Sequence, residues 1–296
     1  RNLEKSFWSG PLEDYRKMDG NGTLTGLDLS AGSRRLELIP YVMTRFEKDG
    51  DNDVEAGLDA RYDFTPSLSG HLTINPDFAT VEADQEQVNL TRFELNLPEK
   101  RNFFMEGNAA YDQRIRLFYS RRISDIYGGA KFYGKVGSNE VSVLSVQTRD
   151  DEAGLDSANY SVFRIKRDIL SNSSLGFLTA NRMVNGRNRG TAGVDAALYF
   201  TETFKLTSQL AAGYGDAAKT DMAFFIRPSH DTSTFHVHLR YTHLGEYFGD
   251  NVNAVGYIRD DNRNELDSAL RKTFWLDRSF LERIEYGSNY NIYWGT

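Results

Sequence analysis

Long segments of the chain alternate between apolar and polar residues, and this period of two constrains the fold more than any other feature. The clearest example is residues 54–64, where every even position is apolar or aromatic and the odd positions carry Glu55, Asp59, Arg61 and Asp63. Successive side chains of a β-strand point to opposite faces, whereas the 3.6-residue period of a helix would mix the two sets. The segment therefore predicts a strand with one apolar and one charged face.

The same alternation recurs along the chain, usually in segments near ten residues long. It is clear in 192–200, 204–214, 235–241 and 284–294, and weaker in 35–47, 68–75, 115–120, 127–136, 139–149, 159–168, 173–182, 220–227, 253–259 and 266–276. Short polar turns separate several of these segments, as expected for antiparallel neighbours. The pattern predicts an all-β chain of about fourteen or fifteen strands.

Two architectures are built from many amphipathic antiparallel strands. A soluble sandwich or barrel, as in a binding module, turns the apolar faces inward, whereas a membrane barrel turns them toward lipid and keeps a polar lumen. Strands of about ten residues match a tilted membrane strand, because soluble strands average about five or six. Aromatic residues such as Phe64, Phe200, Tyr241 and Trp294 end several apolar faces, as interfacial residues do. We therefore predict a transmembrane antiparallel β-barrel of about 14 or more strands.

Composition excludes several other classes. The 35 Lys and Arg residues against 42 Asp and Glu leave a net charge of -7, without the basic stripe expected for a nucleic-acid partner. The chain has no cysteine, which excludes disulfides and thiolate chemistry. No apolar run reaches the roughly 18 residues of a transmembrane helix, and the first residues do not resemble a signal peptide. We expect one barrel domain over 1–296, part of a longer protein.

One stretch, residues 76–112, breaks the alternation and is far longer than a hairpin turn. It is too polar for lipid, so we expect it to fold inward as a plug-like or constricting segment. Unpaired charges inside a barrel are costly, so its acids should pair with bases. The predicted ion-pair network comprises Asp77, Glu82, Asp84, Arg92, Glu99, Lys100, Arg101, Glu106, Arg121 and Arg122.

Several motifs in and after this stretch resemble a known bacterial family. They are 75–78 (NPDF), 81–84 (VEAD), 89–93 (NLTRF), 98–107 (PEKRNFFMEG), 117–123 (LFYSRRI), 128–131 (GGAK) and 160–170 (YSVFRIKRDIL). In this order they resemble the family known as domain of unknown function 5916. The resemblance implies a barrel in the outer membrane of a Gram-negative bacterium, with outer-membrane lipid around it. Relatives commonly carry an N-terminal module similar to family-nine carbohydrate-binding domains, which this sequence lacks.

These features favour a non-enzymatic channel, or a membrane platform that binds other surface or periplasmic proteins. The alternative is a carbohydrate-active surface protein, either glycan-binding or a glycoside hydrolase that uses acids such as Glu82 and Asp84. Hydrolysis would need two carboxylates at a set separation, which a sequence does not provide. The motifs Gly-x-Ser-x-Gly and His-Glu-x-x-His and a phosphate-binding loop are absent. No solute or glycan can be identified from the sequence.

Two sets of residues are weak candidates for metal binding, and no other cofactor is expected. Asp19, Asn21, Thr23 and Asp28 partly fit a calcium loop, but the opening ligand position holds a lysine, so a turn is the favoured interpretation. His236 and His238 lie on one face of a predicted strand, where their rings could converge on a metal. Because no third ligand is evident nearby, two polar lumen residues are the favoured interpretation.

Overall fold

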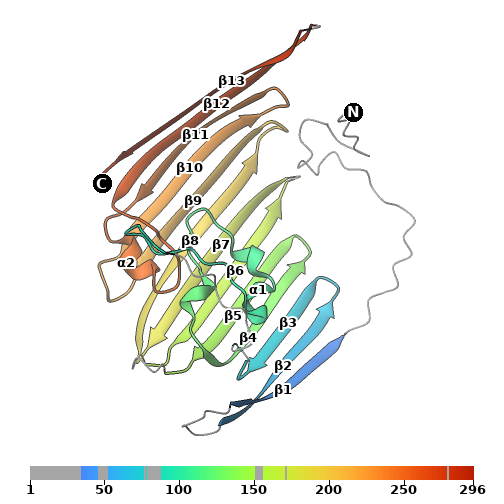
Figure 1. Ribbon diagram of the computed structural model, residues 1–296, viewed down its shortest axis with the longest axis vertical. Helices are drawn as coiled ribbons and strands as arrows, with labels where there is room; N and C mark the ends of the chain where they lie inside the picture. Colours follow the sequence, from blue (N-terminus) through green and yellow to red (C-terminus); the bar gives the residue numbers. More distant parts are fainter. Residues whose placement is uncertain are drawn as a thin grey trace, which may run out of the picture.

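The computed structural model describes residues 35–45, 53–76, 78, 88–150, 156–170, 172–278 and 280–296. Within these residues, thirteen strands form one sheet in which each strand pairs with the next in chain order (Figure 1). The strands are β1 (Leu36–Arg45), β2 (Asp53–Thr65), β3 (Leu68–Ile74), β4 (Ile126–Val136), β5 (Asn139–Thr148), β6 (Asn159–Ile169), β7 (Ser173–Val184), β8 (Arg187–Tyr199), β9 (Phe204–Tyr214), β10 (Asp221–Asp231), β11 (Phe235–Leu244), β12 (Arg263–Arg278) and β13 (Leu281–Trp294). All pairs are antiparallel, which confirms the all-β prediction.

Most connections between strands are tight turns. Between β7 and β8, Asn185 and Gly186 both have positive φ, +49° and +76°, which is the geometry of a two-residue hairpin loop. Two connections are much longer. Residues 75–125 join β3 to β4 and contain the short helices α1 (Asn102–Met105), η1 (Asn108–Tyr111) and η2 (Ser120–Arg122), and residues 245–262 join β11 to β12 and contain α2 (Phe248–Val252).

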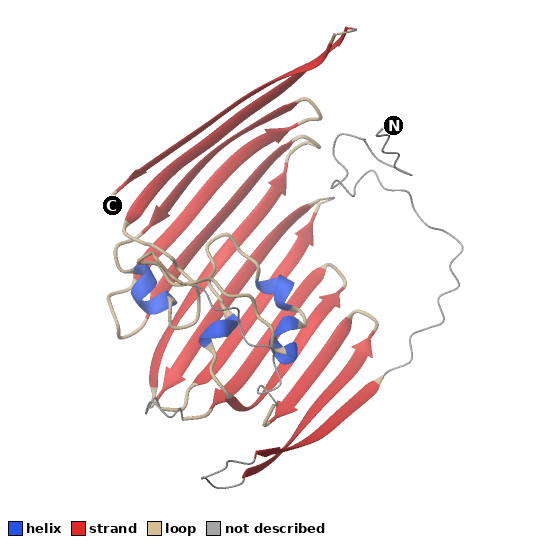
Figure 2. Cartoon of the chain, viewed as in Figure 1, coloured by secondary structure: helices blue, strands red, loops and turns tan. Residues whose placement is uncertain are grey.

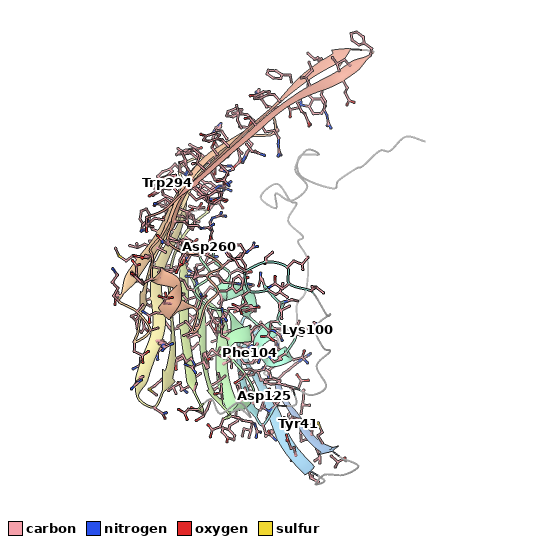
Figure 3. All side chains as sticks on the ribbon, turned by 60° about the vertical axis from the view of Figure 1, so that its left-hand side comes forward. Tyr41, Lys100, Phe104, Asp125, Asp260 and Trp294 are labelled. Atoms are coloured by element: carbon pink, nitrogen blue, oxygen red, sulfur yellow. The ribbon has the colours of Figure 1, made fainter. Side chains whose placement is uncertain are left out.

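All four short helices lie on the same face of the sheet, which we call the inner face (Figures 2 and 3). The inner segment, defined as residues 88–125, runs across this face. Arg61 and Asp63 of β2 point inward, since Arg61 pairs with Glu106 of the inner segment and with Asp63. The even positions of β2 therefore point to the opposite, outer face. The predicted alternation of 54–64 is present as a strand with two chemically different faces.

The outer face is apolar and exposed across the whole sheet. Val42 of β1 is 71% exposed, Val54 of β2 68%, Val194 of β8 49% and Leu239 of β11 50%. Cross-strand partners in an antiparallel pair point to the same face, so the register extends this set from strand to strand. Ordinary monomers in water rarely expose apolar patches of more than a few hundred Å². The outer face thus lacks the partner that a sandwich would supply.

The hydrophobic core lies between the inner face and its two covers. Leu144, Val162 and Leu178 contribute from the middle of the sheet, and all three are fully buried. Above them the inner segment supplies Phe103, Phe104, Tyr111, Ile115, Leu117, Phe118 and Ile123, and the α2 connection supplies Phe248, Val252 and Val255. The core is therefore built from residues far apart in the sequence.

Two predicted strands are wrong, which accounts for thirteen strands in the described residues instead of fifteen candidates. Residues 115–120 and 253–259 lie on the inner face, where they meet in a single isolated bridge between Arg116 and Tyr257. Tyr119 N also donates to the Val255 carbonyl at 2.8 Å. In 115–120 every residue except Arg116 is buried, so its alternation does not mark one buried and one exposed face. Period two alone does not separate a sheet strand from a buried extended segment.

The sheet is open in the described residues, since β1 and β13 each pair with one neighbour only. The predicted barrel closure is therefore not part of this structure. None of the described helices is long and apolar enough to cross a membrane.

Leu117 offers a test of the core. Its side chain is fully buried and lies against Gly193 of β8, where an added Cβ would come within 2.7 Å of Leu117 Cδ1. Leu117→Ala should lower the free energy of unfolding by about 2–5 kcal/mol, because the cavity cannot collapse fully. Denaturant unfolding in detergent measures this loss. Leu239→Ala, on the exposed outer face, is the control, and an equal loss in both variants would contradict the placement of the core.

Candidate functional site

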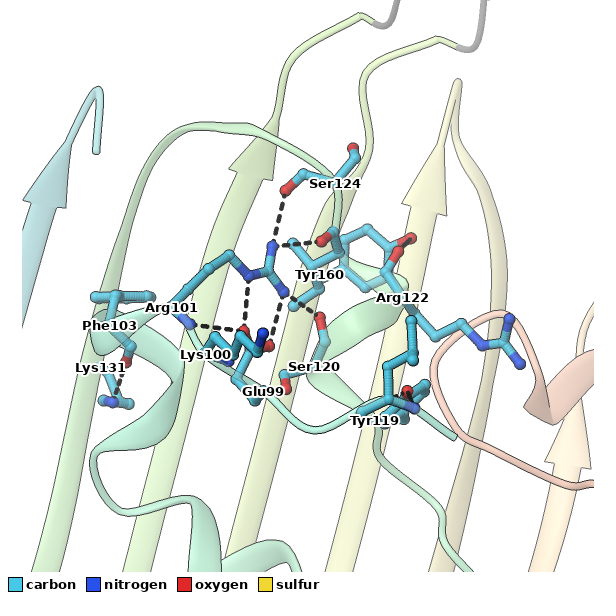
Figure 4. Close-up of polar contacts among 12 residues, drawn as sticks. Glu99, Lys100, Arg101, Phe103, Tyr119, Ser120, Arg122, Ser124, Lys131 and Tyr160 are labelled. Atoms are coloured by element: carbon cyan, nitrogen blue, oxygen red, sulfur yellow. Dashed lines mark hydrogen bonds and ion pairs between the residues drawn. The ribbon is translucent and has the colours of Figure 1, made fainter. Parts of the chain in front are cut away.

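Arg101 links two parts of the inner segment through a buried hydrogen-bond network (Figure 4). Its guanidinium donates to both carboxylate oxygens of Glu99, at 2.9 and 2.8 Å. It also donates to the backbone carbonyls of Ile123 at 2.7 Å and Ser120 at 2.9 Å. Arg101 Cζ lies 4.3 Å from the ring centroid of Phe104, a cation–π contact. The parts of the inner segment near 100 and near 122 are thereby held together.

Glu99 stays ionised in this network although it is buried. Burial raises the pKa of a carboxyl group, but the hydrogen bonds and charge of Arg101 outweigh burial and hold the pKa of Glu99 below its usual range. The backbone N–H groups of Lys100 and Arg101 each donate to Glu99 Oε1 at 3.0 Å. All hydrogen bonds to this carboxylate thus favour its charged form.

A second cluster attaches α1 to strands β2, β3 and β4. Glu106 lies 3.3 Å from both His71 Nδ1 and Arg61 Nη1, and it accepts a 2.7 Å hydrogen bond from the Tyr133 hydroxyl. The contact with His71 is the largest influence on Glu106. Together with Tyr133 and Arg61, it overcomes the effect of burial and lowers the pKa of Glu106 to about 2. The carboxylate therefore remains charged from neutral pH down to strongly acidic conditions.

Side chains of the sheet also satisfy the backbone of the inner segment. Lys131 of β4, 4% exposed, donates to the carbonyls of Phe103 and Glu106. Gln209 of β9 donates to the Ile115 carbonyl and accepts from the Ile115 N–H, both at 2.9 Å. These contacts replace the strand partner that the irregular backbone lacks. An unpaired backbone group buried here would be unfavourable by about 1–3 kcal/mol.

Arg164 of β6 and Asp195 of β8 form a buried ion pair beneath the segment, with an N–O distance of 2.5 Å. Asp195 also accepts from Gln113 at 2.7 Å, and Arg164 Nε donates to the Ala110 carbonyl at 3.2 Å. The pair therefore contacts the inner segment twice. It links the segment to the middle of the sheet.

The remaining charged contacts lie toward the α2 connection. Arg122 forms a bidentate pair with Glu94, at 2.9 and 2.6 Å, and donates to the Gly256 carbonyl. Arg92 pairs with Asp260 at 3.2 Å, but the Arg92 side chain is 76% exposed. The inner segment and the α2 connection thus hold each other on the inner face.

The structure describes seven of the ten residues of the predicted network. Glu99, Arg101, Glu106, Arg122 and Arg92 have the partners given above, but Glu106 pairs with the sheet and Arg122 with Glu94, which the prediction did not include. Lys100 and Arg121 lie in the same region. Asp77, Glu82 and Asp84 lie outside the described residues, as do the calcium candidates Asp19, Asn21, Thr23 and Asp28. The segment that crosses the inner face extends to 125, beyond the predicted end at 112.

Sequence reasoning missed the sheet residues that receive the segment. They are Arg61, His71, Lys131, Tyr133, Arg164, Asp195 and Gln209. Each is a polar or amphipathic residue at an inward position of its strand, so the alternation could have identified the set but not its partners. Among the described residues, no group of three or more His, Asp or Glu is placed to hold a metal ion.

Comparison with family models confirms the resemblance seen in the motifs. The model of the family described as "Domain of unknown function (DUF5916)" matches residues 33–155, which span β1 to β5 and the inner segment. The motif at 160–170 lies beyond the matched range. No curated protein matches the sequence.

Several solved structures are similar over most of their length. Acinetobacter baumannii OccAB2 is 11% identical, with 89% of this chain and 82% of that chain covered and a TM-score of 0.33. Pseudomonas aeruginosa OccK1 (OpdK) is 11% identical, with 90% and 89% covered and a TM-score of 0.31. The structure of Pseudomonas aeruginosa OpdK with vanillate is 11% identical, with 90% of both chains covered and a TM-score of 0.32.

Arg101 should be essential for docking of the inner segment. Arg101→Met leaves the Glu99 carboxylate buried without a cation, and breaking a buried pair in this way is unfavourable by about 3–5 kcal/mol. We expect the variant to lose that much stability in denaturant unfolding and to become sensitive to proteolysis within 88–125. Arg92→Met, which removes an exposed pair, should change stability by about 1 kcal/mol or less. Equal behaviour of the two variants would refute the role of Arg101.

Proposed function

We propose that this chain forms the wall of a non-enzymatic channel in the outer membrane of a Gram-negative bacterium. The observation that carries the proposal is the orientation of the sheet: its apolar set is exposed on the outer face while its charged set points inward. Water does not favour such an arrangement, because apolar surface is stabilised only when it is removed from water. A lipid bilayer removes it without any protein partner. Lipid is therefore the partner that fits the outer face.

The inner face has the polarity of an aqueous lumen. Beyond the inner segment, charged side chains of both signs continue over β9 to β12, including Lys205, Asp231, Arg240 and Asp267. Such a surface suits water and polar solutes. The inner segment crosses this face, so we propose that it narrows the lumen as a constriction. The ion pairs described above would then keep the constriction in place.

A channel requires that the edges of the sheet be closed. Strand edges in a bilayer would leave backbone N–H and C=O groups without partners, at several kcal/mol each. The proposal therefore requires that the free edges of β1 and β13 be paired in the membrane, with each other or with further strands.

A platform for other surface proteins is compatible with the same barrel. No contact among the described residues favours it, or glycan cleavage, over a channel.

The lipid-facing assignment can be tested on a single strand. Val194 of β8 is 49% exposed on the outer face, and Ala197 points to the inner face of the same strand. Val194→Arg should impair assembly in lipid vesicles by about 2–4 kcal/mol if the residue lies near the bilayer midplane. Ala197→Arg is the matched control and should assemble nearly as well as the unchanged chain. Both are measured by folding titrations in vesicles.

The opposite ranking of these variants would overturn the membrane assignment. A monodisperse, detergent-free monomer that buries Val194 against a second sheet would also overturn it.

The constriction can be tested by conductance in a planar bilayer. Deleting residues 80–96 should raise the single-channel current, because part of the segment that crosses the inner face is removed while the thirteen strands are untouched. Arg92→Met is the control for loss of charge without loss of the segment, and its current should stay near that of the unchanged chain. An unchanged current in the deletion variant, with the barrel folded, would contradict the constriction.

A further inference from the structure

Two histidines on the inner face form a contact that the proposed channel does not explain. His236 and His238 of β11 point to the same face, and His236 Nε2 lies 3.0 Å from His238 Nδ1. Their side chains are 29% and 12% exposed, so both remain accessible from the inner face. Neither contacts the ion pairs of the inner segment described above.

Each ring is oriented by a carboxylate on its other nitrogen. His236 Nδ1 contacts Asp231 of β10, and His238 Nε2 lies 3.4 Å from Asp267 of β12. An ionised carboxylate only accepts hydrogen bonds, so His236 carries a proton on Nδ1 and His238 carries one on Nε2. The two remaining nitrogens, His236 Nε2 and His238 Nδ1, then face each other with lone pairs. At 3.0 Å these two nitrogens are close enough to bind one cation together.

The same arrangement is typical of metal-binding histidines. Such residues almost always donate the other ring N–H to a carboxylate or carbonyl, which fixes the tautomer and the ring orientation. Metal–nitrogen bonds of about 2.0–2.1 Å place two adjacent ligand nitrogens roughly 2.8–3.4 Å apart, for square-planar to tetrahedral angles. The observed separation of 3.0 Å falls in this range.

We propose that His236 and His238 chelate a divalent transition metal, Cu²⁺ or Zn²⁺. The two imidazole nitrogens supply two ligands, and water fills the remaining positions. The protein would supply two ligands only, since no group of three or more His, Asp or Glu is placed around a metal in the described residues.

The surrounding charges determine which cations fit. Lys205 of β9 lies 3.9 Å from Asp231, and Arg240 of β11 lies 2.7 Å from Asp267. Arg227 of β10 and Arg114 of the inner segment add further positive charge to the cluster. The carboxylates are therefore already paired with cations, which disfavours Ca²⁺ and Mg²⁺, since these need several free oxygen ligands. Imidazole ligands favour Cu²⁺ and Zn²⁺, with Cu²⁺ the tighter.

The test is calorimetric titration of the untagged, folded chain in detergent with Cu²⁺ alone at pH 7. We expect one Cu²⁺ site per chain. Electron paramagnetic resonance should show two nitrogen ligands. Excess Ca²⁺ should not compete. No binding by the folded chain would overturn the proposal.

Variants separate this site from other histidines. Asp267→Asn, which removes a supporting carboxylate, should weaken Cu²⁺ binding about 10–100-fold. His238→Gln removes a ligand and should weaken Cu²⁺ binding by more than this. His230→Gln is the matched control: His230 lies on neighbouring β10 but at an outward position, where its ring packs against Phe235. The affinity of His230→Gln for Cu²⁺ should equal that of the unchanged chain. Equal affinity of His238→Gln and the unchanged chain would refute the site, and denaturant unfolding of each variant confirms that it is folded.

Discussion

The backbone of the inner segment is hydrogen-bonded mainly by side chains, and the arrangement of the whole inner face depends on this. The segment has only three short helical turns, so most of its buried N–H and C=O groups have no regular partner. Arg101, Lys131 and Gln209 supply the missing hydrogen bonds, two of them from strands of the sheet. The backbone hydrogen bonds of the sheet fix the spacing of those strands, and this in turn fixes the position of the segment.

The charged groups that make these bonds are themselves paired. Glu99 pairs with Arg101, Asp195 pairs with Arg164, and Glu106 pairs with both Arg61 and His71. A buried charge without a partner would be strongly unfavourable, so each cation that binds a backbone carbonyl also needs an acid nearby. This explains why the inner face carries both charge signs. The apolar side chains of the outer face have no such cover, and lipid is the environment that suits them.

The His236–His238 pair belongs to a different part of the inner face. It lies among charges of β9 to β12, outside the contacts that hold the inner segment. Asp231 and Asp267 orient the two imidazole rings, whereas the acids of the inner segment pair with cations that bind backbone carbonyls. The proposed metal site and the proposed constriction therefore rest on separate sets of residues and can fail independently.

Local periodicity determined the faces of the strands. The alternation of 54–64, 192–200 and 235–241 alone predicted which side chains share a face, because successive residues of a strand must point to opposite sides. It also showed that residues 76–112 break the pattern of the strands. Tertiary structure decided that 115–120 and 253–259 pair on the inner face rather than in the sheet, and that Lys131 and Gln209 bind the segment. Those contacts join residues between about twenty-five and one hundred and forty positions apart. A periodic pattern carries no information about such distances, since it records only which way each side chain points and not what it meets.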